Sequence, residues 1–134
     1  MSYKDGAGLI VVRDFFDGQK FLILLNHDGK WDLPKGGMEP NESTFECAVR
    51  ETFEETSIDD LSFDWGIDPI SSDNLSFYIA RSHQDPVIKM NPVYGNYEHI
   101  QGVWVSPIIA VELLPDFLKT FAVSAIDRLQ QTIV

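Results

Sequence analysis

The sequence predicts an α/β fold in which one mixed β-sheet lies between helices. Short runs of β-branched and apolar residues alternate with turn signals through much of the chain, a capped helix follows a glycine-rich loop, and a second helical pattern fills the C-terminal part. A chain of 134 residues fits one domain, since domains cluster at roughly 100 to 150 residues. Because no repeat or linker divides it, residues 1–134 are expected to form a single domain.

The predicted strands begin near the N-terminus. Segments 7–13 and 20–25 are expected to pair antiparallel through an Asp17-Gly18 turn. The next segment, 26–37, contains Pro34 and paired glycines, which exclude a continuing helix and predict a loop of fixed shape. The remaining assignments are strands at 61–67, 75–80 and 102–105, turns at 68–69 and 71–74, and a long polar loop at 81–97.

Two helices are predicted from apolar spacing and end signals. Ser43 is an N-cap residue, and Glu46 three positions later completes a capping box for a helix over 44–56. In the C-terminal part, apolar residues recur at helical spacing from Leu114 to Leu129 and predict an amphipathic helix. Together with the strands, these helices give the mixed sheet its two covering layers.

The charge of the chain limits its partners. Ten Lys and Arg against 21 Asp and Glu give a formal net charge of −11, and no basic cluster occurs. Such a field repels long nucleic acids but admits a small polyanion whose charge is neutralised by metal ions. No apolar run approaches the ~20 residues of a membrane span, and the first residues lack the apolar segment of a signal peptide. A cytoplasmic location without a membrane partner is expected, and nothing indicates the oligomeric state.

Cys47 is the single cysteine, which excludes an internal disulfide and a thiolate metal cluster. Its place within the predicted helix 44–56 indicates a buried thiol rather than a catalytic one.

Three glutamates in the predicted helix carry the main chemical signal. Glu51, Glu54 and Glu55 stand at positions i, i+3 and i+4 and therefore project from one face, where like charges repel by some tenths of a kcal/mol per pair. A divalent cation would remove that cost, and oxygen ligands of this kind suit magnesium or manganese. The alternative is a solvated acidic face. Arg50 beside them is expected to pair with Glu42 and hold the preceding loop against the helix.

The spacing around these residues resembles the Nudix box, G-x5-E-x7-R-E-U-x-E-E-x-G-U, in which U is a bulky aliphatic residue. Gly36, Glu42 and the segment 50–58 match it, with two departures. Thr52 replaces an aliphatic residue, and we expect its methyl group to pack in the core and its hydroxyl to bond a carbonyl one turn back. Ser57 replaces the glycine that closes the helix, at a cost on the order of 1 kcal/mol if its backbone is left-handed. Neither change removes a carboxylate.

The resemblance implies the Nudix α/β/α sandwich, a magnesium or manganese cofactor and a small nucleotide substrate. It implies that Glu51, Glu54 and Glu55 are metal ligands, with Arg50 as part of the catalytic motif, and that a backbone carbonyl near Lys35 or Gly36 completes the site. Gly36, Gly37 and Glu42 are its structural residues. Hydrolysis of a phosphoanhydride bond by an activated water is the activity that the resemblance implies.

Two further segments, 31–36 and 97–104, are similar to the diadenosine tetraphosphate hydrolase subgroup, whose members yield ATP and AMP. That resemblance implies that Glu98 is a further metal ligand or the general base; otherwise Glu98 is an exposed loop acid. His99 is expected either to orient Glu98 or to contact phosphate, or else to be an ordinary surface or core histidine. The remaining candidates for substrate binding are Lys35 and Arg81 for phosphates, unless they are solvated, and Tyr78 and Tyr97, with Phe77 and Tyr94, for adenine, unless they lie in the core.

Other functions remain open. The same metal chemistry serves Nudix relatives that act on RNA 5′ ends, nucleoside triphosphates or inositol pyrophosphates, although the charge of −11 weighs against RNA and densely phosphorylated inositol. A different class is a non-catalytic Nudix module that binds a nucleotide. Loss of a glutamate of the box would favour such a module, and here all of them are present.

Overall fold

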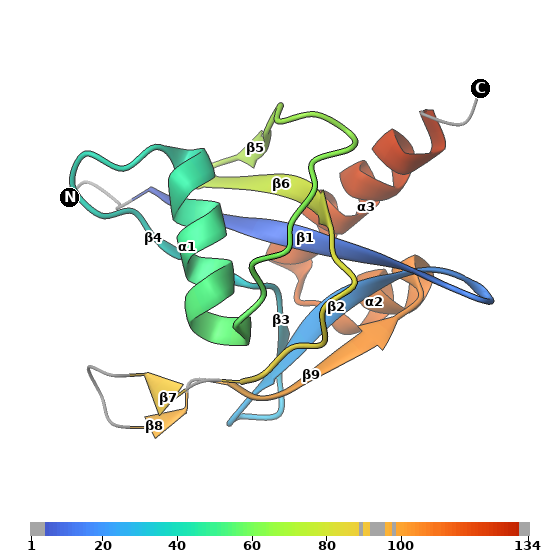
Figure 1. Ribbon diagram of the computed structural model, residues 1–134, viewed down its shortest axis with the longest axis horizontal. Helices are drawn as coiled ribbons and strands as arrows, with labels where there is room; N and C mark the ends of the chain where they lie inside the picture. Colours follow the sequence, from blue (N-terminus) through green and yellow to red (C-terminus); the bar gives the residue numbers. More distant parts are fainter. Residues whose placement is uncertain (1–4, 89, 92–95, 98, 132–134) are drawn as a thin grey trace.

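In the computed structural model, which describes residues 5–88, 90–91, 96–97 and 99–131, seven of the described strands form one mixed sheet (Figure 1). The order is β3-β2-β1-β6-β5, with β4 also paired to β1 and β9 to β2. β1 and β6 run parallel, and the other pairs are antiparallel. The predicted mixed sheet is confirmed. Its strands are β1 (Gly6–Phe15), β2 (Gly18–Asn26), β3 (Trp31–Asp32), β4 (Lys35–Gly37), β5 (Ile70–Ser72), β6 (Leu75–Arg81) and β9 (His99–Val105).

The expected antiparallel pair at the start of the chain is the β1–β2 hairpin. Phe15 pairs with Gly18, so the turn residues are Phe16 and Asp17, one position earlier than the predicted Asp17-Gly18 turn. Gly18 has φ 127°, which an L side chain rarely adopts, and glycine therefore begins β2 without strain.

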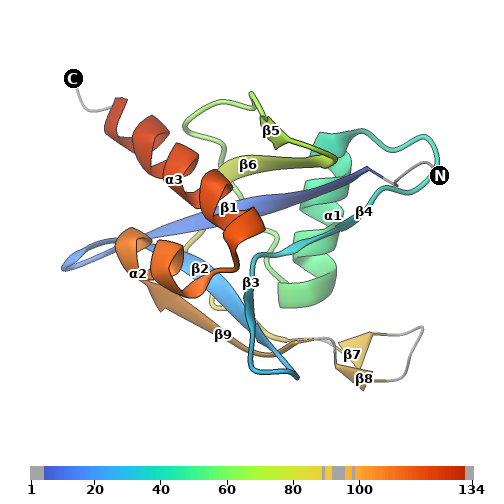
Figure 2. The same cartoon turned by 180° about the vertical axis from the view of Figure 1, so that it is seen from behind.

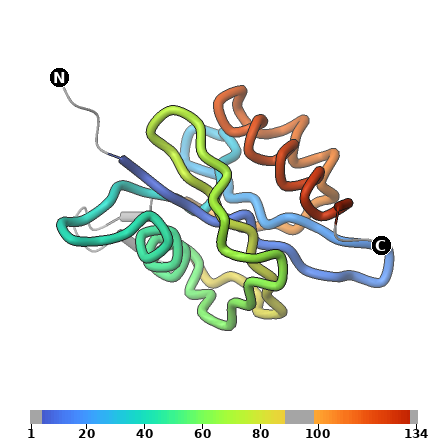
Figure 3. The backbone as a smooth tube through the Cα atoms, turned by 90° about the horizontal axis from the view of Figure 1, so that it is seen from above, coloured from blue at the N-terminus to red at the C-terminus, as the bar shows by residue number. Residues whose placement is uncertain are grey.

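The two faces of the sheet are covered by different helices, as the view in Figure 3 shows. Alternate residues of β1 divide between two cores: Leu9 and Val11 pack with α1 (Thr44–Thr56), whereas Ile10 and Val12 pack with α2 (Pro107–Leu113) and α3 (Asp116–Gln131). The same alternation holds in β2 and β6 because successive side chains of a strand point to opposite faces. Figures 1 and 2 show α1 and α3 from opposite sides of this three-layer fold.

Helix α1 matches its predicted bounds and its predicted cap. Ser43 accepts a hydrogen bond from the Glu46 N–H, and the Glu46 carboxylate accepts one from the Ser43 N–H, which makes the capping box. Thr52 is fully buried and its hydroxyl donates to the Ala48 carbonyl, 2.8 Å away. Ser57 ends the helix with φ 65°, in the left-handed region. Both expected departures from the box therefore take the expected conformations.

The C-terminal amphipathic pattern forms α3, and a short helix that the sequence reading missed, α2, precedes it. A signal for α2 exists in the sequence, since Ser106 is its N-cap residue and Pro107 occupies its first turn, a common pairing. Among the described helices none is long and apolar enough to cross a membrane.

The loop predicted at 26–37 contains the short strands β3 and β4, and two assignments in the middle of the chain are wrong. Segment 61–67 is not a strand: Ser62 makes a single bridge to Arg81, and a turn follows in which Gly66 has φ 89°. The edge strand is instead β5, which contains Ser71 and Ser72 of the predicted turn. Residues 70–72 form a strand because they pair with β6, and no local sequence pattern specifies that pairing. The predicted loop 81–97 contains a further short pair, β7 (Met90–Asn91) with β8 (Asn96–Tyr97).

We expect Ser57→Gly to be more stable than Ser57→Ala by about 1 kcal/mol, because only glycine adopts the left-handed backbone without strain. Both substitutions remove the hydrogen bond from the Ser57 hydroxyl to the Val87 carbonyl, so their difference isolates the backbone. Denaturant unfolding of the two variants measures it. The same pair of substitutions at Ser124, inside α3, is the control and should show the opposite order. Alanine equal to glycine at position 57 would contradict the assignment.

Candidate functional site

The acidic face of α1 lies against β4 at a point where only glycine fits. A Cβ atom on Gly36 would stand 2.1–2.3 Å from the carboxylate atoms of Glu51, so the carboxylate occupies the space of the absent side chain. A second glycine, Gly8 of β1, admits the segment before β4: its Cβ would lie 2.2 Å from the Pro34 carbonyl oxygen. These two close approaches bring the backbone of β4 between β1 and the glutamates.

Arg50 is the centre of the charged contacts on this face. Its Nε and Nη2 donate to the two carboxylate oxygens of Glu42 at 2.6 and 2.9 Å, which confirms the predicted pair. Nη1 donates to Glu51 at 2.9 Å and to Glu54 at 3.2 Å, and Nη2 also donates to the Gly37 carbonyl at 2.9 Å. One guanidinium thus joins the loop before the helix to Glu51 and Glu54 of the helix.

This pairing changes the ionisation of the groups involved. The hydrogen bonds from Arg50 lower the pKa of Glu42 to about 2, although partial burial opposes the shift. Those with Glu42, ahead of those with Glu54 and Glu51, raise the pKa of Arg50. Both groups therefore stay charged across the pH range in which enzymes work. Cys47, as expected, is fully buried, and its burial raises the pKa of the thiol to about 11.

Glu55 is held separately, in a buried polar cluster. Its Oε1 accepts from the backbone N–H of Lys35 at 3.2 Å, and its Oε2 lies 3.2 Å from Nδ1 of His99. On the other side of the ring, Nε2 of His99 lies 3.2 Å from Oδ2 of Asp32. Burial acts to raise the pKa of Asp32, but the bond with His99 and the charge of Lys35 lower it overall. His99 therefore faces Asp32 and Glu55, whereas its expected partner Glu98 lies outside the described residues.

The strand arrangement explains why these side chains meet. β2 has β3 on one side and β9 on the other, with Leu24 paired to Asp32 and Asn26 paired to His99. The register of β9 shifts at Ile100, which is the extra residue of a β-bulge and is 52% exposed. Bulges redirect neighbouring side chains, and here His99, the residue before Ile100, is 3% exposed.

The donor set of this region fits a hard divalent cation. The three carboxylates of α1 are oxygen donors of the kind that such a cation binds, and Gly36 leaves room for one of them against the strand backbone. In the described part of the chain, no three acidic, histidine or cysteine side chains are gathered around one point as a ready-made metal site. Arg50 accounts for this arrangement because it draws Glu51 and Glu54 to its own guanidinium.

Lys35, a candidate for phosphate binding, contacts the glutamate face through its backbone N–H. Its ammonium lies 3.3 Å from Asp32 and 5.8 Å from the centre of the Phe117 ring, so it belongs to the edge of the buried cluster.

Two other candidates for substrate binding are corrected by the structure. Arg81 pairs with Asp14 and Asp64 and stacks on Trp65, so its charge is already compensated away from the glutamates. Tyr78 is 4% exposed and its hydroxyl shares a hydrogen bond with Thr44, so it is a core residue under α1 and cannot stack on a base. Phe77 is likewise fully buried, on the opposite face. Tyr94 and the side chain of Tyr97 lie outside the described part of the chain.

Sequence reasoning missed Asp32. Glu42 and Arg50 are eight residues apart and share a motif, but 67 positions separate Asp32 from His99. Only the pairing of β3 and β9 to the same strand brings them together. The one local signal was the i, i+3 spacing of Asp32 and Lys35.

We expect Glu42→Gln to lower the melting temperature near pH 7, and the difference from the unsubstituted protein to shrink as the pH falls from 4.5 towards 2. The pKa of Glu42 is depressed in the folded state from 4.5 to about 2, so the stabilisation is complete above 4.5 and is lost as the pH falls through the folded value. Thermal unfolding between pH 7 and 3 measures it. Glu112→Gln, on α2, is the control; a difference for Glu42→Gln that is independent of pH would contradict the assignment.

Three known proteins indicate what the chain is similar to. An "RNA pyrophosphohydrolase" from Bartonella henselae is 31% identical over 65 residues, 43% of this chain and 38% of that protein. A Bacillus subtilis protein provisionally named an 8-oxo-dGTP diphosphatase is 44% identical over 55 residues, 40% of this chain and 35% of that protein. The matched segments thus span well under half of both relatives. A solved Ap4A hydrolase from C. elegans has the same fold, with a TM-score of 0.76 at 20% identity over 96% of this chain and 99% of that one.

The family model described as NUDIX domain matches residues 3–124, nearly the whole chain. The expected Nudix α/β/α arrangement agrees with the observed sheet between α1 and the pair α2 and α3. The chain belongs to the NUDIX family.

Proposed function

We propose that the chain is a metal-dependent Nudix pyrophosphohydrolase that cleaves a phosphoanhydride bond of a nucleoside polyphosphate with water. The observation that carries this proposal is the complete set of charged box residues around Arg50, with Glu51 packed on Gly36 and Glu55 buried beside it. Three carboxylates close together on one helix repel one another, and a bound divalent cation would compensate that repulsion.

Glu51, Glu54 and Glu55 would hold magnesium or manganese. When bound, such an ion neutralises charge on the phosphates and lowers the pKa of a water molecule. The protein's own groups divide the remaining tasks. Glu55 is fixed by Lys35 N–H and His99, whereas the Glu54 side chain is 53% exposed and free to reorient around its contact with Arg50.

Arg50 acts in this proposal as a positioning residue. Its guanidinium compensates Glu51 and Glu54 when no cation is present, and its bonds to Glu42 and the Gly37 carbonyl keep the loop on the helix. Glu98 is proposed as a further ligand or as the base that takes the proton from water, and it lies outside the described residues.

The proposed substrate is diadenosine tetraphosphate, which with one water gives ATP and AMP. Segments 31–36 and 97–104, which are similar to that subgroup, support this choice, and the fold shared with the C. elegans hydrolase is consistent with it. The names of the two relatives favour a second candidate class, an oxidised nucleoside triphosphate or a triphosphorylated RNA end. A net charge of −11 weighs against a long nucleic acid in either case.

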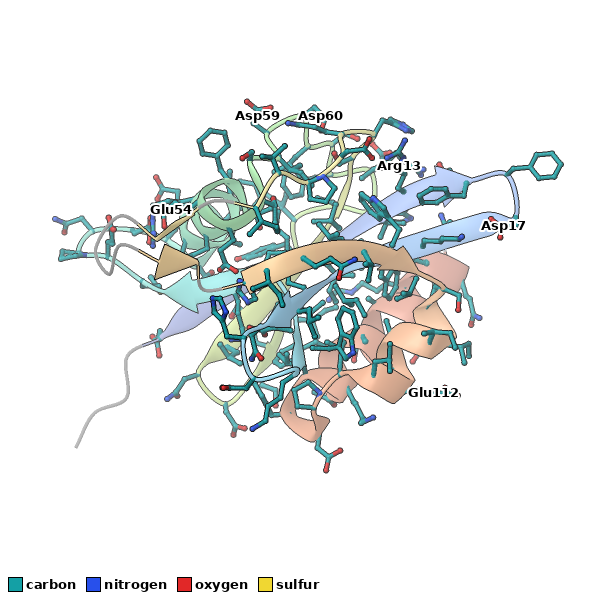
Figure 4. The ribbon with its side chains drawn as sticks, turned by 90° about the horizontal axis from the view of Figure 1, so that it is seen from below. Arg13, Asp17, Glu54, Asp59, Asp60 and Glu112 are labelled. Atoms are coloured by element: carbon teal, nitrogen blue, oxygen red, sulfur yellow. The ribbon has the colours of Figure 1, made fainter. Side chains whose placement is uncertain are left out.

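We expect the purified protein with magnesium to convert diadenosine tetraphosphate to ATP and AMP, and Glu54→Gln to slow turnover by roughly two orders of magnitude or more. Glu112→Gln is the matched control, because Glu112 belongs to α2 on the opposite side of the sheet from Glu54 (Figure 4). A chelator should stop the reaction and added magnesium should restore it.

Triphosphorylated RNA and 8-oxo-dGTP are tested in parallel under the same conditions. Turnover of one of them alone would keep the metal chemistry and reject the dinucleotide. Nucleotide binding without metal-dependent turnover of any substrate would reject the enzyme and favour a binding module.

A further inference from the structure

Four polar contacts form a closed ring that begins and ends on Lys35. The Lys35 ammonium lies 3.3 Å from Oδ1 of Asp32, and Oδ2 of Asp32 lies 3.2 Å from Nε2 of His99. Nδ1 of His99 lies 3.2 Å from Oε2 of Glu55, and Oε1 of Glu55 accepts from the Lys35 backbone N–H. Both oxygens of each carboxylate and both nitrogens of the imidazole lie within 3.3 Å of the next member of the ring.

The members of the ring are largely withdrawn from water. The side chains of His99, Glu55 and Asp32 are 3%, 6% and 16% exposed. Burial of this kind is unfavourable unless each polar atom has a partner, and a carboxylate with both oxygens engaged has a fixed orientation. Glu54, one residue earlier on the same helix face, is 53% exposed. The carboxylate of Glu55 is therefore held among protein groups, whereas that of Glu54 faces solvent.

We propose that His99 is a positioning residue whose ring, held by Asp32, fixes the carboxylate of Glu55 in the orientation that binds a divalent cation. The inference rests on the proposed function, because it takes Glu55 to be a metal ligand. Groups behind a ligand that fix its orientation typically change metal affinity about 10–100-fold when removed. Asp32 has the supporting part: it holds the ring from the side away from Glu55, and Lys35 in turn holds Asp32.

His99 makes two contacts in the ring, one with Glu55 and one with Asp32, and two different substitutions remove them one at a time. The side-chain amide of asparagine can take the place of Nδ1, and that of glutamine the place of Nε2. His99→Asn therefore keeps a polar group facing Glu55, whereas His99→Gln keeps one facing Asp32 and leaves none at the place of Nδ1.

The test is the affinity for Mn²⁺ alone, measured by calorimetry and by the electron paramagnetic resonance signal of the free ion. We expect His99→Gln to bind Mn²⁺ about 10–100-fold more weakly than the unsubstituted protein, and His99→Asn, which loses only the contact with Asp32, to recover part of that loss. His83→Gln, at an exposed loop histidine, is the matched control and should leave the affinity unchanged. With substrate present, saturating Mn²⁺ should restore the turnover of His99→Gln, as a defect of affinity requires.

Glu54→Gln separates failure of this inference from failure of the proposed function. If the unsubstituted protein and Glu54→Gln both fail to bind Mn²⁺, the proposed function is wrong and the inference fails with it. If Glu54→Gln loses binding while His99→Gln binds as well as the unsubstituted protein, only the inference is overturned. Equal losses in His99→Asn and His99→Gln would also overturn it, because they would reflect the missing ring rather than the polar group that faces Glu55.

Asp32→Asn decides the question should His99→Gln not fold. It leaves the imidazole in the core and alters only the group behind it, and weaker Mn²⁺ binding is again expected. An unchanged affinity in folded Asp32→Asn would overturn the proposal.

Discussion

The hydrogen bonds of one guanidinium to three carboxylates are the interaction on which the rest of the site depends. Without Arg50, Glu51 and Glu54 would repel each other on one face of α1, and nothing would tie Glu42 and the loop to that helix. Arg50 also donates to the carbonyl of Gly37, the last residue of β4, so the same side chain ties this strand to the helix. One residue therefore both compensates the charges of Glu51 and Glu54 and holds the neighbouring backbone of β4.

Local patterns in the sequence were enough for most of the framework. β1, β2, β6 and α1 carry alternating or helical apolar patterns with turn or cap residues at their ends, and these patterns predict each end of the elements to within two residues. Pattern alone failed where partners are distant: β5 is a strand because β6 lies beside it, and segment 61–67 has strand composition but no such neighbour along most of its length. Helix α2 was missed although Ser106 and Pro107 mark its start.

The same division holds for the candidate site. The box glutamates and the pair of Arg50 with Glu42 follow from spacing along the chain. Residue type suggested that Arg81 and Tyr78 bind substrate. Arg81 instead makes ion pairs with two aspartates, and Tyr78 is buried in the core. Neither arrangement can be predicted from the neighbouring sequence. The meeting of Asp32 and His99 depends on two strands that share β2, so it could be found only from the fold.

Because of the bulge in β9, the number of residues in this strand determines which side chain stands opposite Asn26. With Ile100 as its extra residue, His99 stands opposite Asn26; in a regular ladder Ile100 would take that place. A single residue inserted between Ile100 and Gln101 would become the extra residue of the bulge, so Ile100 would stand opposite Asn26 and an imidazole would be exchanged for an aliphatic side chain without any substitution. An insertion at this place in β9 acts as the replacement of a buried residue, and relatives are best aligned here by strand register rather than by the number of residues between motifs.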